Sequence, residues 1–318
     1  AAVGTNVNDL KVGDRVFGIA PSSFASQVVV PRAFVAATPE VLSDTEAAAM
    51  PLVFVTAYYA LVTVGRLKAT DTVLIHAASG GLGLAAIQVA RKIGARVLAT
   101  AGTPEKVAFL HSFGVEHVFD SRSTSFVDGV LGVTEGQGVD VVLNSLAGEA
   151  LTGGLSLLRR FGRFLDVTKR DIYNDMRAGL SPFRKGLSYH AIDLEQVINF
   201  DHDTIQQLLR WLVGDVGSGA VQPLPLQTFS YRQAVEAFRC LSMARHIGKV
   251  VLVAEAPERV QPHWKPTPNV LGGGNAAPLE PPPNVLRGGN APPLGPPTYV
   301  VTGGMGGFGR EVVLWLLR

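Results

Sequence analysis

Short apolar runs alternate with longer mixed stretches through the middle of the chain, and both have the lengths of secondary-structure elements. Residues 72–75 form a continuous run of the kind that a strand buried on both faces requires. The alternation with short connections predicts an α/β fold with a doubly wound parallel sheet over residues 53–193. Strands are expected at 72–77, 96–100, 117–119, 139–143, 162–166 and 187–192, and helices at 54–64, 81–93, 104–113, 124–131 and 148–158.

The flanking regions have a different character. Residues 1–52 indicate short strands and turns, with a turn feeding a strand over 9–18 and another strand at 26–30. These are too few to close a sheet, so the chain is expected to begin partway through a β-rich domain. Residues 194–257 are expected to pack back against this region, through helices at 203–213 and 231–243 and a strand at 249–254.

Residues 71–90, DTVLIHAASGGLGLAAIQVA, carry a glycine motif at the end of the first strand. Gly81-x-Gly83-x-x-Ala86 fits the dinucleotide fingerprint: a tight turn, a close approach to a diphosphate, and packing of helix on strand. The helix start also offers free N–H groups and a positive dipole end to phosphates. Such a motif alone is weak, but strand, turn and helix here have the right lengths. A Rossmann-type site is therefore predicted, with its turn at Ala78, Ser79, Gly80, Gly81, Leu82 and Gly83.

The end of the chain differs from both regions in its composition and motifs. Residues 258–297 are rich in Pro and Gly and contain an imperfect repeat, PTPNVLGGGNAAPLEPP and then PPPNVLRGGNAPPLGPP. Two such repeats cannot bury a core, so a semi-extended tether is predicted. Residues 298–318 contain a second fingerprint, Gly304-x-Gly306-x-x-Gly309, between a strand start and a helix. The chain is therefore expected to be cut just inside a second nucleotide-binding unit.

Composition excludes several classes of protein. The chain has 318 residues, 47% of them hydrophobic and 17% charged, which predicts a globular protein of more than one domain. A net charge of +2 is too small to argue for a nucleic-acid or membrane partner. The single Cys240 excludes a disulfide framework and a multi-cysteine zinc site. Neither a membrane-length apolar run nor a signal peptide is found, so a cytoplasmic location is expected.

The region after the second strand favours NADPH over NADH. An NAD site usually places Asp or Glu about 20 residues after the glycine turn to hold the ribose 2′-OH. Residues 99–103 read ATAGT, with no acid. The hydroxyls of Thr100 and Thr103 and the cations Lys106 and Arg122 suit a 2′-phosphate instead. The alternative is that Lys106 and Arg122 are solvated surface charges.

Polar residues follow the later strands at their carboxyl ends, where open α/β sheets bind ligands. Asn144, Ser145 and Leu146 are expected beside the nicotinamide ribose, unless they only form a cap or turn. Lys169 follows the strand at 162–166 and Asp193 the strand at 187–192. If these strands are neighbours, both side chains reach one crevice.

Several separated segments together resemble a known family: VFVTAYYAL (53–61), HAASGGLGLAAIQVA (76–90), VDVVLNSLAGE (139–149), GRFLDVTKRD (162–171) and HIGKVVL (246–252). They closely resemble the enoyl reductase domain of type I polyketide synthases and animal-type fatty acid synthases. This domain belongs to the zinc-free branch of the medium-chain dehydrogenase/reductase superfamily. The terminal TYVVTGGMGGFG resembles the start of a ketoreductase domain, which follows the enoyl reductase in these synthases.

The resemblance implies a domain organisation and partners. Residues 1–52 and 194–257 would form a partial GroES-like substrate domain and 53–193 the Rossmann domain. Residues 258–297 would be the linker, and 298–318 the start of the ketoreductase domain. The implied substrate is an enoyl thioester on an acyl carrier protein, and the family is compatible with a homodimer. The resemblance also places Thr56, Gly248 and Lys249 near the cofactor.

The implied reaction needs a hydride at Cβ of the enoyl thioester, and then stabilisation and protonation of the resulting enolate. The thioester carbonyl already makes Cβ electrophilic, so no metal is expected. The resemblance places Lys169 on the family's catalytic lysine and Asp193 on its partner aspartate. Lys169 would donate the proton or steady the enolate, and Asp193 would orient it and keep it charged. The alternative is that the two form only a structural ion pair.

Two other functions compete with enoyl reduction in a synthase. A stand-alone quinone or enone oxidoreductase would share the cofactor site but would need neither tether nor second fingerprint. A degenerate, non-catalytic synthase domain would not be expected to keep the glycine turn, Lys169 and Asp193 together.

Overall fold

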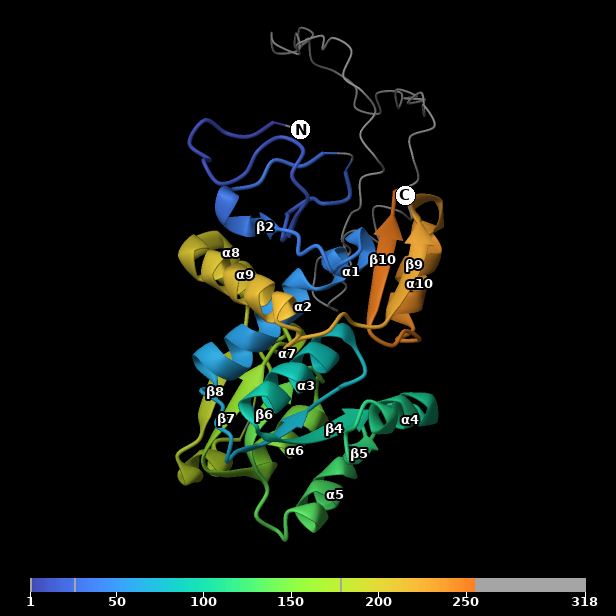
Figure 1. Cartoon of the computed structure of the whole chain (residues 1–318). Helices are drawn as coiled ribbons and strands as arrows, with labels where there is room; N and C mark the ends of the chain where they lie inside the picture. Colours follow the sequence, from blue (N-terminus) through green and yellow to red (C-terminus); the bar gives the residue numbers. More distant parts are fainter. Residues whose placement is uncertain (1, 26, 178, 255–318) are drawn as a thin grey trace, which may run out of the picture.

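The computed structural model describes residues 2–25, 27–177 and 179–254. The tether predicted at 258–297 and the second fingerprint predicted at 298–318 lie outside these ranges. A parallel sheet in the order β5-β4-β3-β6-β7-β8 forms the centre of the described chain (Figure 1). Its strands are β3 (Thr72–Ile75), β4 (Arg96–Ala101), β5 (His117–Asp120), β6 (Val139–Asn144), β7 (Leu158–Asp166) and β8 (Ser188–Ala191).

The strand order reverses between β3 and β6. From β3 the chain winds outward through β4 to the edge strand β5, and it then returns beside β3 as β6 and winds to the other edge, β8. The doubly wound sheet predicted from the sequence is thereby confirmed. Its switch point, outside the carboxyl ends of β3 and β6, is where sheets of this topology bind ligands.

Helices cover both faces of the sheet. α2 (Pro51–Tyr58), α3 (Gly81–Ile93) and α9 (His202–Gly217) bury their apolar side chains in the larger core, and α5 (Phe126–Val133) and α6 (Glu149–Leu157) in the second. Strand β3 is buried along its whole length. Because successive strand residues point to opposite faces, Val73 and Ile75 join the larger core and Leu74 joins the second.

Two smaller sheets flank the central one. β1 (Val16–Gly18) pairs antiparallel with β2 (Val35–Ala37), and β9 (Leu226–Ser230) pairs parallel with β10 (Lys249–Val253). The C-terminal part packs on the N-terminal part: α1 (Asp44–Ala49) contacts β10, and α9 contacts β2. The remaining elements are η1 (Arg32–Phe34), η2 (Tyr59–Val64), α4 (Pro104–Ser112), α7 (Arg170–Tyr173), η3 (Ser181–Lys185), α8 (Leu194–Phe200), η4 (Tyr231–Gln233) and α10 (Ala234–Ser242).

The structure differs from the sequence prediction in several elements. A strand was predicted at 26–30, but residues 27–30 form none, and Val29 is fully exposed. Conversely, β2 is a strand that was not predicted. A strand needs a partner, and within the described chain β1 finds it in residues 35–37. β7 starts at Leu158, before an irregularity in its pairing with β6, so it is longer than the predicted 162–166. α8 and β9 were also missed; β9 directly follows Pro223-Leu224-Pro225, which reads as a loop.

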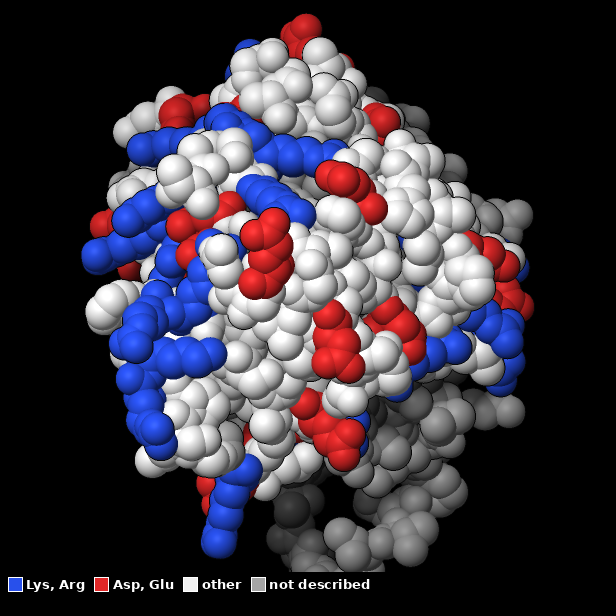
Figure 2. Space-filling model, turned by 90° about the horizontal axis from the view of Figure 1, so that it is seen from below, with Lys and Arg blue, Asp and Glu red and all other residues white. Residues whose placement is uncertain are grey.

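The surface carries both signs of charge. Figure 2 shows the molecule from below, with Lys and Arg side chains gathered along one side of that face and Asp and Glu spread over its middle. None of the helices in the described ranges combines the length and apolar character needed to cross a bilayer.

Candidate active site

The glycine turn joins β3 to α3 and leaves the helix start open to an anion. Gly80 is the N-cap of α3 and offers no side chain to cap the first-turn N–H groups. These groups and the positive end of the helix dipole point out at the switch point. Gly83 lies against the turn itself, because a Cβ placed on it would come within 2.5 Å of the Ala78 oxygen and 2.6 Å of its carbonyl carbon.

Gly248 and Lys249 cross over this turn. The Gly248 N–H donates to the Ser79 oxygen at 2.8 Å, and Gly248 bridges Gly80. The Lys249 side chain is 4% exposed and lies on Gly81. Its burial lowers the pKa of the Lys249 amine to about 8. The structure thus brings the predicted Gly248 and Lys249 to the predicted glycine turn.

Three of the four residues predicted for a 2′-phosphate, Thr103, Lys106 and Arg122, gather beyond the carboxyl end of β4. Thr103 caps α4, its hydroxyl accepting the Lys106 N–H at 3.4 Å. Arg122 lies against Gly102, and burial, followed by the positive charge of Arg122, lowers the pKa of Lys106. Lys106 is half-buried, and its ammonium donates to the Ala244 oxygen at 2.6 Å, which holds it in place.

Thr100 lies below the turn, away from solvent. It is fully buried, and its hydroxyl accepts the Ala77 N–H at 3.2 Å and lies 3.1 Å from His76 Nδ1. His76 is buried beside the Phe126 ring, and this burial lowers its pKa to about 3. Thr100 and His76 therefore support the turn from inside, and the contact of Thr100 with a cofactor expected from the sequence is replaced by this internal role.

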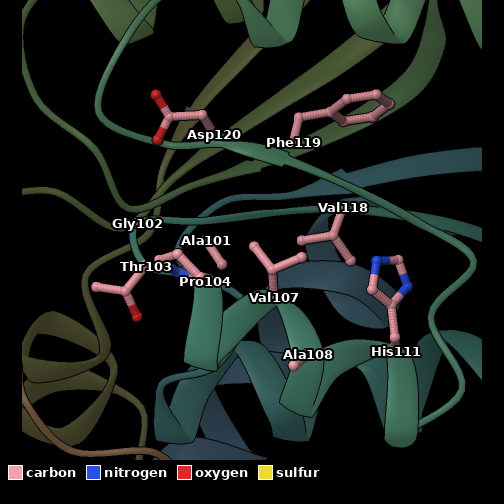
Figure 3. Close-up of a pocket in the computed structure, with 10 residues that line it drawn as sticks. All are labelled: Ala101, Gly102, Thr103, Pro104, Val107, Ala108, His111, Val118, Phe119 and Asp120. Carbon is pink, nitrogen blue, oxygen red and sulfur yellow. The ribbon is translucent and has the colours of Figure 1, made fainter.

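An apolar cavity of about 470 Å³ lies between α4 and β5. Val107 and His111 of α4 face Val118 of β5 across it, with Thr103 and Asp120 at one end (Figure 3). Its walls are almost entirely apolar, and neither Lys106 nor Arg122 lines it. The cavity therefore adjoins the predicted phosphate-binding cluster without being part of it.

Asn144 ends β6 in a buried hydrogen-bond network. Its amide nitrogen donates to the Leu146 oxygen at 2.8 Å and to Asp166 at 3.0 Å, and its amide oxygen accepts the Leu146 N–H at 3.2 Å. Asp166, fully buried, also accepts Thr168 Oγ1 at 2.6 Å and the Tyr189 hydroxyl at 2.7 Å. Burial and this hydrogen bond raise the Tyr189 pKa.

Asn144 is therefore held by protein groups and shapes the turn at Ser145 and Leu146. The Ser145 hydroxyl donates to the His76 oxygen at 3.0 Å, which ties the end of β6 to the end of β3. Thr56 lies one turn beyond Val53, which adjoins Gly81, and its hydroxyl donates to the Leu52 oxygen at 2.6 Å. The side-chain contacts of Asn144 are therefore those of a turn residue, which is the alternative that the sequence left open.

Lys169 and Asp193 meet at the carboxyl edge of the sheet. They follow β7 and β8, which are parallel neighbours, and Lys169 Nζ lies 2.9 Å from Asp193 Oδ1. The two side chains are 23% and 24% exposed, so they are partly shielded and still reachable. Asp193 is fixed as the N-cap of α8, its carboxylate accepting the Glu195 N–H at 3.0 Å.

Sequence reasoning missed Glu195, the second carboxylate on this lysine. Glu195 Oε2 accepts a hydrogen bond from Lys169 Nζ at 2.6 Å. Burial alone would lower the pKa of Lys169, but the hydrogen bonds and charges of Glu195 and Asp193 outweigh it and raise the pKa. The Asp-x-Glu spacing at a helix start was the available signal, because both side chains there lie in the first turn.

Within the described ranges, no group of three or more His, Cys, Asp or Glu side chains is arranged to hold a metal ion. Cys240, half-buried on α10, lies 3.2 Å from Gln227 Oε1. The described residues therefore do not provide the Cys and His ligand set of a zinc site.

Comparison with known proteins places the chain in a family. Residues 113–252 match the family model of zinc-binding dehydrogenases. A phenolphthiocerol/phthiocerol polyketide synthase protein of Mycobacterium tuberculosis is 40% identical over 251 residues, which are 79% of this chain and 12% of that protein. The phthioceranic/hydroxyphthioceranic acid synthase of the same species is 44% identical over 253 residues, again 79% and 12%. The chain therefore spans about an eighth of these curated relatives.

Three solved structures match this chain over a much larger share of their own length. The JamJ enoyl reductase superposes with a TM-score of 0.74 at 36% identity, covering 80% of this chain and 76% of that one. The nucleotide-binding subdomain of the PpsC enoyl reductase from Mycobacterium tuberculosis, 42% identical with a TM-score of 0.53, covers 55% of this chain and 98% of that one. A curacin-pathway protein described as an ER cyclopropanase matches at 35% identity with a TM-score of 0.74, covering 80% and 75%. The chain belongs to the enoyl reductase domains of polyketide synthases.

Proposed function

We propose that the chain catalyses NADPH-dependent reduction of the α,β-double bond of an enoyl thioester carried on an acyl carrier protein. The observation that carries this proposal is the Lys169–Asp193 pair on neighbouring strand ends, at the same sheet edge as the glycine turn. An anion-binding helix start and a proton donor therefore share the carboxyl edge of the sheet, with β6 between the strands that carry them. The carrier protein, the adjoining ketoreductase, a homodimer and the cytoplasmic location remain predictions.

The residues present fit a nicotinamide dinucleotide. The uncapped start of α3 and the buried Lys249 amine form a cationic corner for a diphosphate. Thr103, Lys106 and Arg122 gather where a 2′-phosphate would need donors and positive charge. When bound, the dihydronicotinamide supplies the hydride.

The chain's own residues would then supply the proton for Cα and stabilise the negative charge of the enolate oxygen. The Lys169 ammonium would stabilise the enolate oxygen or deliver a proton from Nζ to Cα. Asp193, fixed by its capping role, keeps the amine charged and oriented. Asp166 holds Asn144 and Thr168, so the rim formed by the ends of β6 and β7 is rigid before a ligand binds.

Mixing the complete domain with NADPH and a crotonyl thioester tests this proposal, with absorbance of the reduced nicotinamide as the readout. Rapid oxidation with the thioester and none with a quinone is expected. Preference for the quinone would favour the stand-alone oxidoreductase, and no oxidation with either would favour a degenerate domain. Because one structural relative is described as a cyclopropanase, the product is also checked by mass spectrometry for the saturated thioester.

The cofactor preference depends on two cations. Lys106→Ala and Arg122→Ala are each expected to lower the NADPH-over-NADH ratio of kcat/KM by about 10-fold, because a charge-assisted hydrogen bond contributes about 1.5–3 kcal/mol. The lower end applies because both side chains are accessible to water. Steady-state kinetics with both cofactors measures the ratio. If both variants keep the ratio of the parent, these residues do not bind the 2′-phosphate.

Affinity for NADPH is expected to fall as the pH rises above about 8. The pKa of the Lys249 amine is about 8, so the free protein loses this positive charge above that pH, while the diphosphate stays charged. The dissociation constant should then rise up to tenfold per pH unit, measured by cofactor fluorescence between pH 6.5 and 9.5. Lys249→Met should bind more weakly and lack this rise; a parent profile that is flat across pH 8 would contradict the assignment.

A further inference from the structure

Lys169 is held by two carboxylates of different character, although one would suffice to keep it charged. Asp193 is fixed: its carboxylate caps α8 and is only 24% exposed. Glu195 lies two residues along the same helix, and its side chain is 66% exposed. Its carboxylate nevertheless makes the shorter contact, 2.6 Å against 2.9 Å.

We propose that Glu195 is a positioning residue, which holds the Lys169 ammonium at the sheet edge between substrates and releases it when an acyl thioester arrives. An exposed carboxylate exchanges easily between protein and water, so its bond to Lys169 opens at little cost. Asp193 stays in place when Glu195 leaves, because the helix start holds it. The ammonium then has a free N–H to direct at the substrate.

The same contact sets how readily Lys169 gives up its proton. Asp193 and Glu195 are the charged groups that act on its pKa within the described chain, and both raise it. The other carboxylates near this edge are engaged elsewhere: Asp166 with Asn144, and Asp171 with the Gly148 N–H at 2.8 Å. Loss of the Glu195 charge must therefore lower the pKa of Lys169, while a proton donor becomes a stronger acid as its pKa falls.

The inference rests on the proposed function, but its test does not require activity. In the full chain, Lys169 is labelled with limiting acetic anhydride from pH 8 to pH 12, because its pKa is raised, and peptide mass spectrometry gives the pH at which the amine becomes reactive. Glu195→Gln should lower that midpoint by about half a pH unit. Asp203→Asn, which removes an exposed carboxylate from the same position of α9, should leave it unchanged.

The kinetic arm uses the alkaline limb of the kcat/KM profile, where the lysine acid of the free enzyme, still held by Glu195, loses its proton. Glu195→Gln should move this limb to lower pH by the same amount. A midpoint that Glu195→Gln does not move overturns the inference, whatever the activity. A shifted midpoint in a chain that reduces no enoyl thioester supports the role of Glu195 in holding Lys169 and shows that the proposed function has failed.

Discussion

Replacing Lys169 and Asp193 together by alanine is expected to lower kcat for enoyl reduction by about 10²- to 10⁴-fold, the range typical of general acid catalysis. In this pair, the Lys169 ammonium at the strand ends can balance the negative charge of an enolate. Lys169 Nζ lies 2.9 Å from Asp193 Oδ1. The KM for NADPH should change little, because neither side chain takes part in the glycine turn. Stopped-flow measurement of nicotinamide oxidation separates this chemical step from binding.

A matched pair at the opposite end of the sheet controls for the loss of a salt bridge. Arg159 and Asp140 lie 3.1 Å apart and are similarly shielded, at 29% and 20% exposed. Their double alanine variant should lower the melting temperature and keep kcat. If the Lys169/Asp193 variant lost less than about threefold in kcat, the pair would be structural, as the sequence alone allowed.

The parallel sheet could be predicted because its strands satisfy one strong local condition. A strand buried on both faces, such as β3, needs an unbroken apolar run, and a run of this kind is visible without any partner. In the small sheets, β10 also has such a run and was predicted, whereas β2 and β9 carry no such signal. Residues 27–30 look more strand-like than Val35–Ala37, yet only the latter pair with β1. Their structure depends on which segments meet in space, and a local pattern does not contain that information.

In the candidate site, too, some features could be predicted from the sequence and others could not. Lys169 and Asp193 could be predicted to meet because carboxyl ends of neighbouring parallel strands share an edge, and the structure places them in contact. Side-chain orientation could not be predicted. Thr100 and Asn144 lie at the predicted strand ends, but both are fully buried and their polar atoms bond to protein. Glu195, in contrast, reaches Lys169 from a helix that the sequence did not predict.

Gly83→Ala is expected to destabilise the protein by about 1–3 kcal/mol, the usual cost of forcing an extra methyl group into a packed interior. The added Cβ would lie 2.5–2.6 Å from the carbonyl group of Ala78, which is backbone and cannot turn aside. Gly214→Ala is the control, since its Cβ would meet nothing within 4 Å on α9. There alanine should stabilise the helix by about 1 kcal/mol. Thermal and urea unfolding measure both changes.

The same substitution should also weaken NADPH binding, and the two effects have one cause. To clear the Ala78 carbonyl, the start of α3 must move away from the end of β3, and its free N–H groups move with it. The motif rule explains the second glycine by close approach of backbone to diphosphate, whereas here the nearest obstacle is the protein's own turn. A Gly83→Ala variant with parental stability but weak NADPH binding would support the motif rule, in which this glycine allows the diphosphate to approach the backbone. A destabilised variant with parental affinity would show that the helix start does not hold the diphosphate.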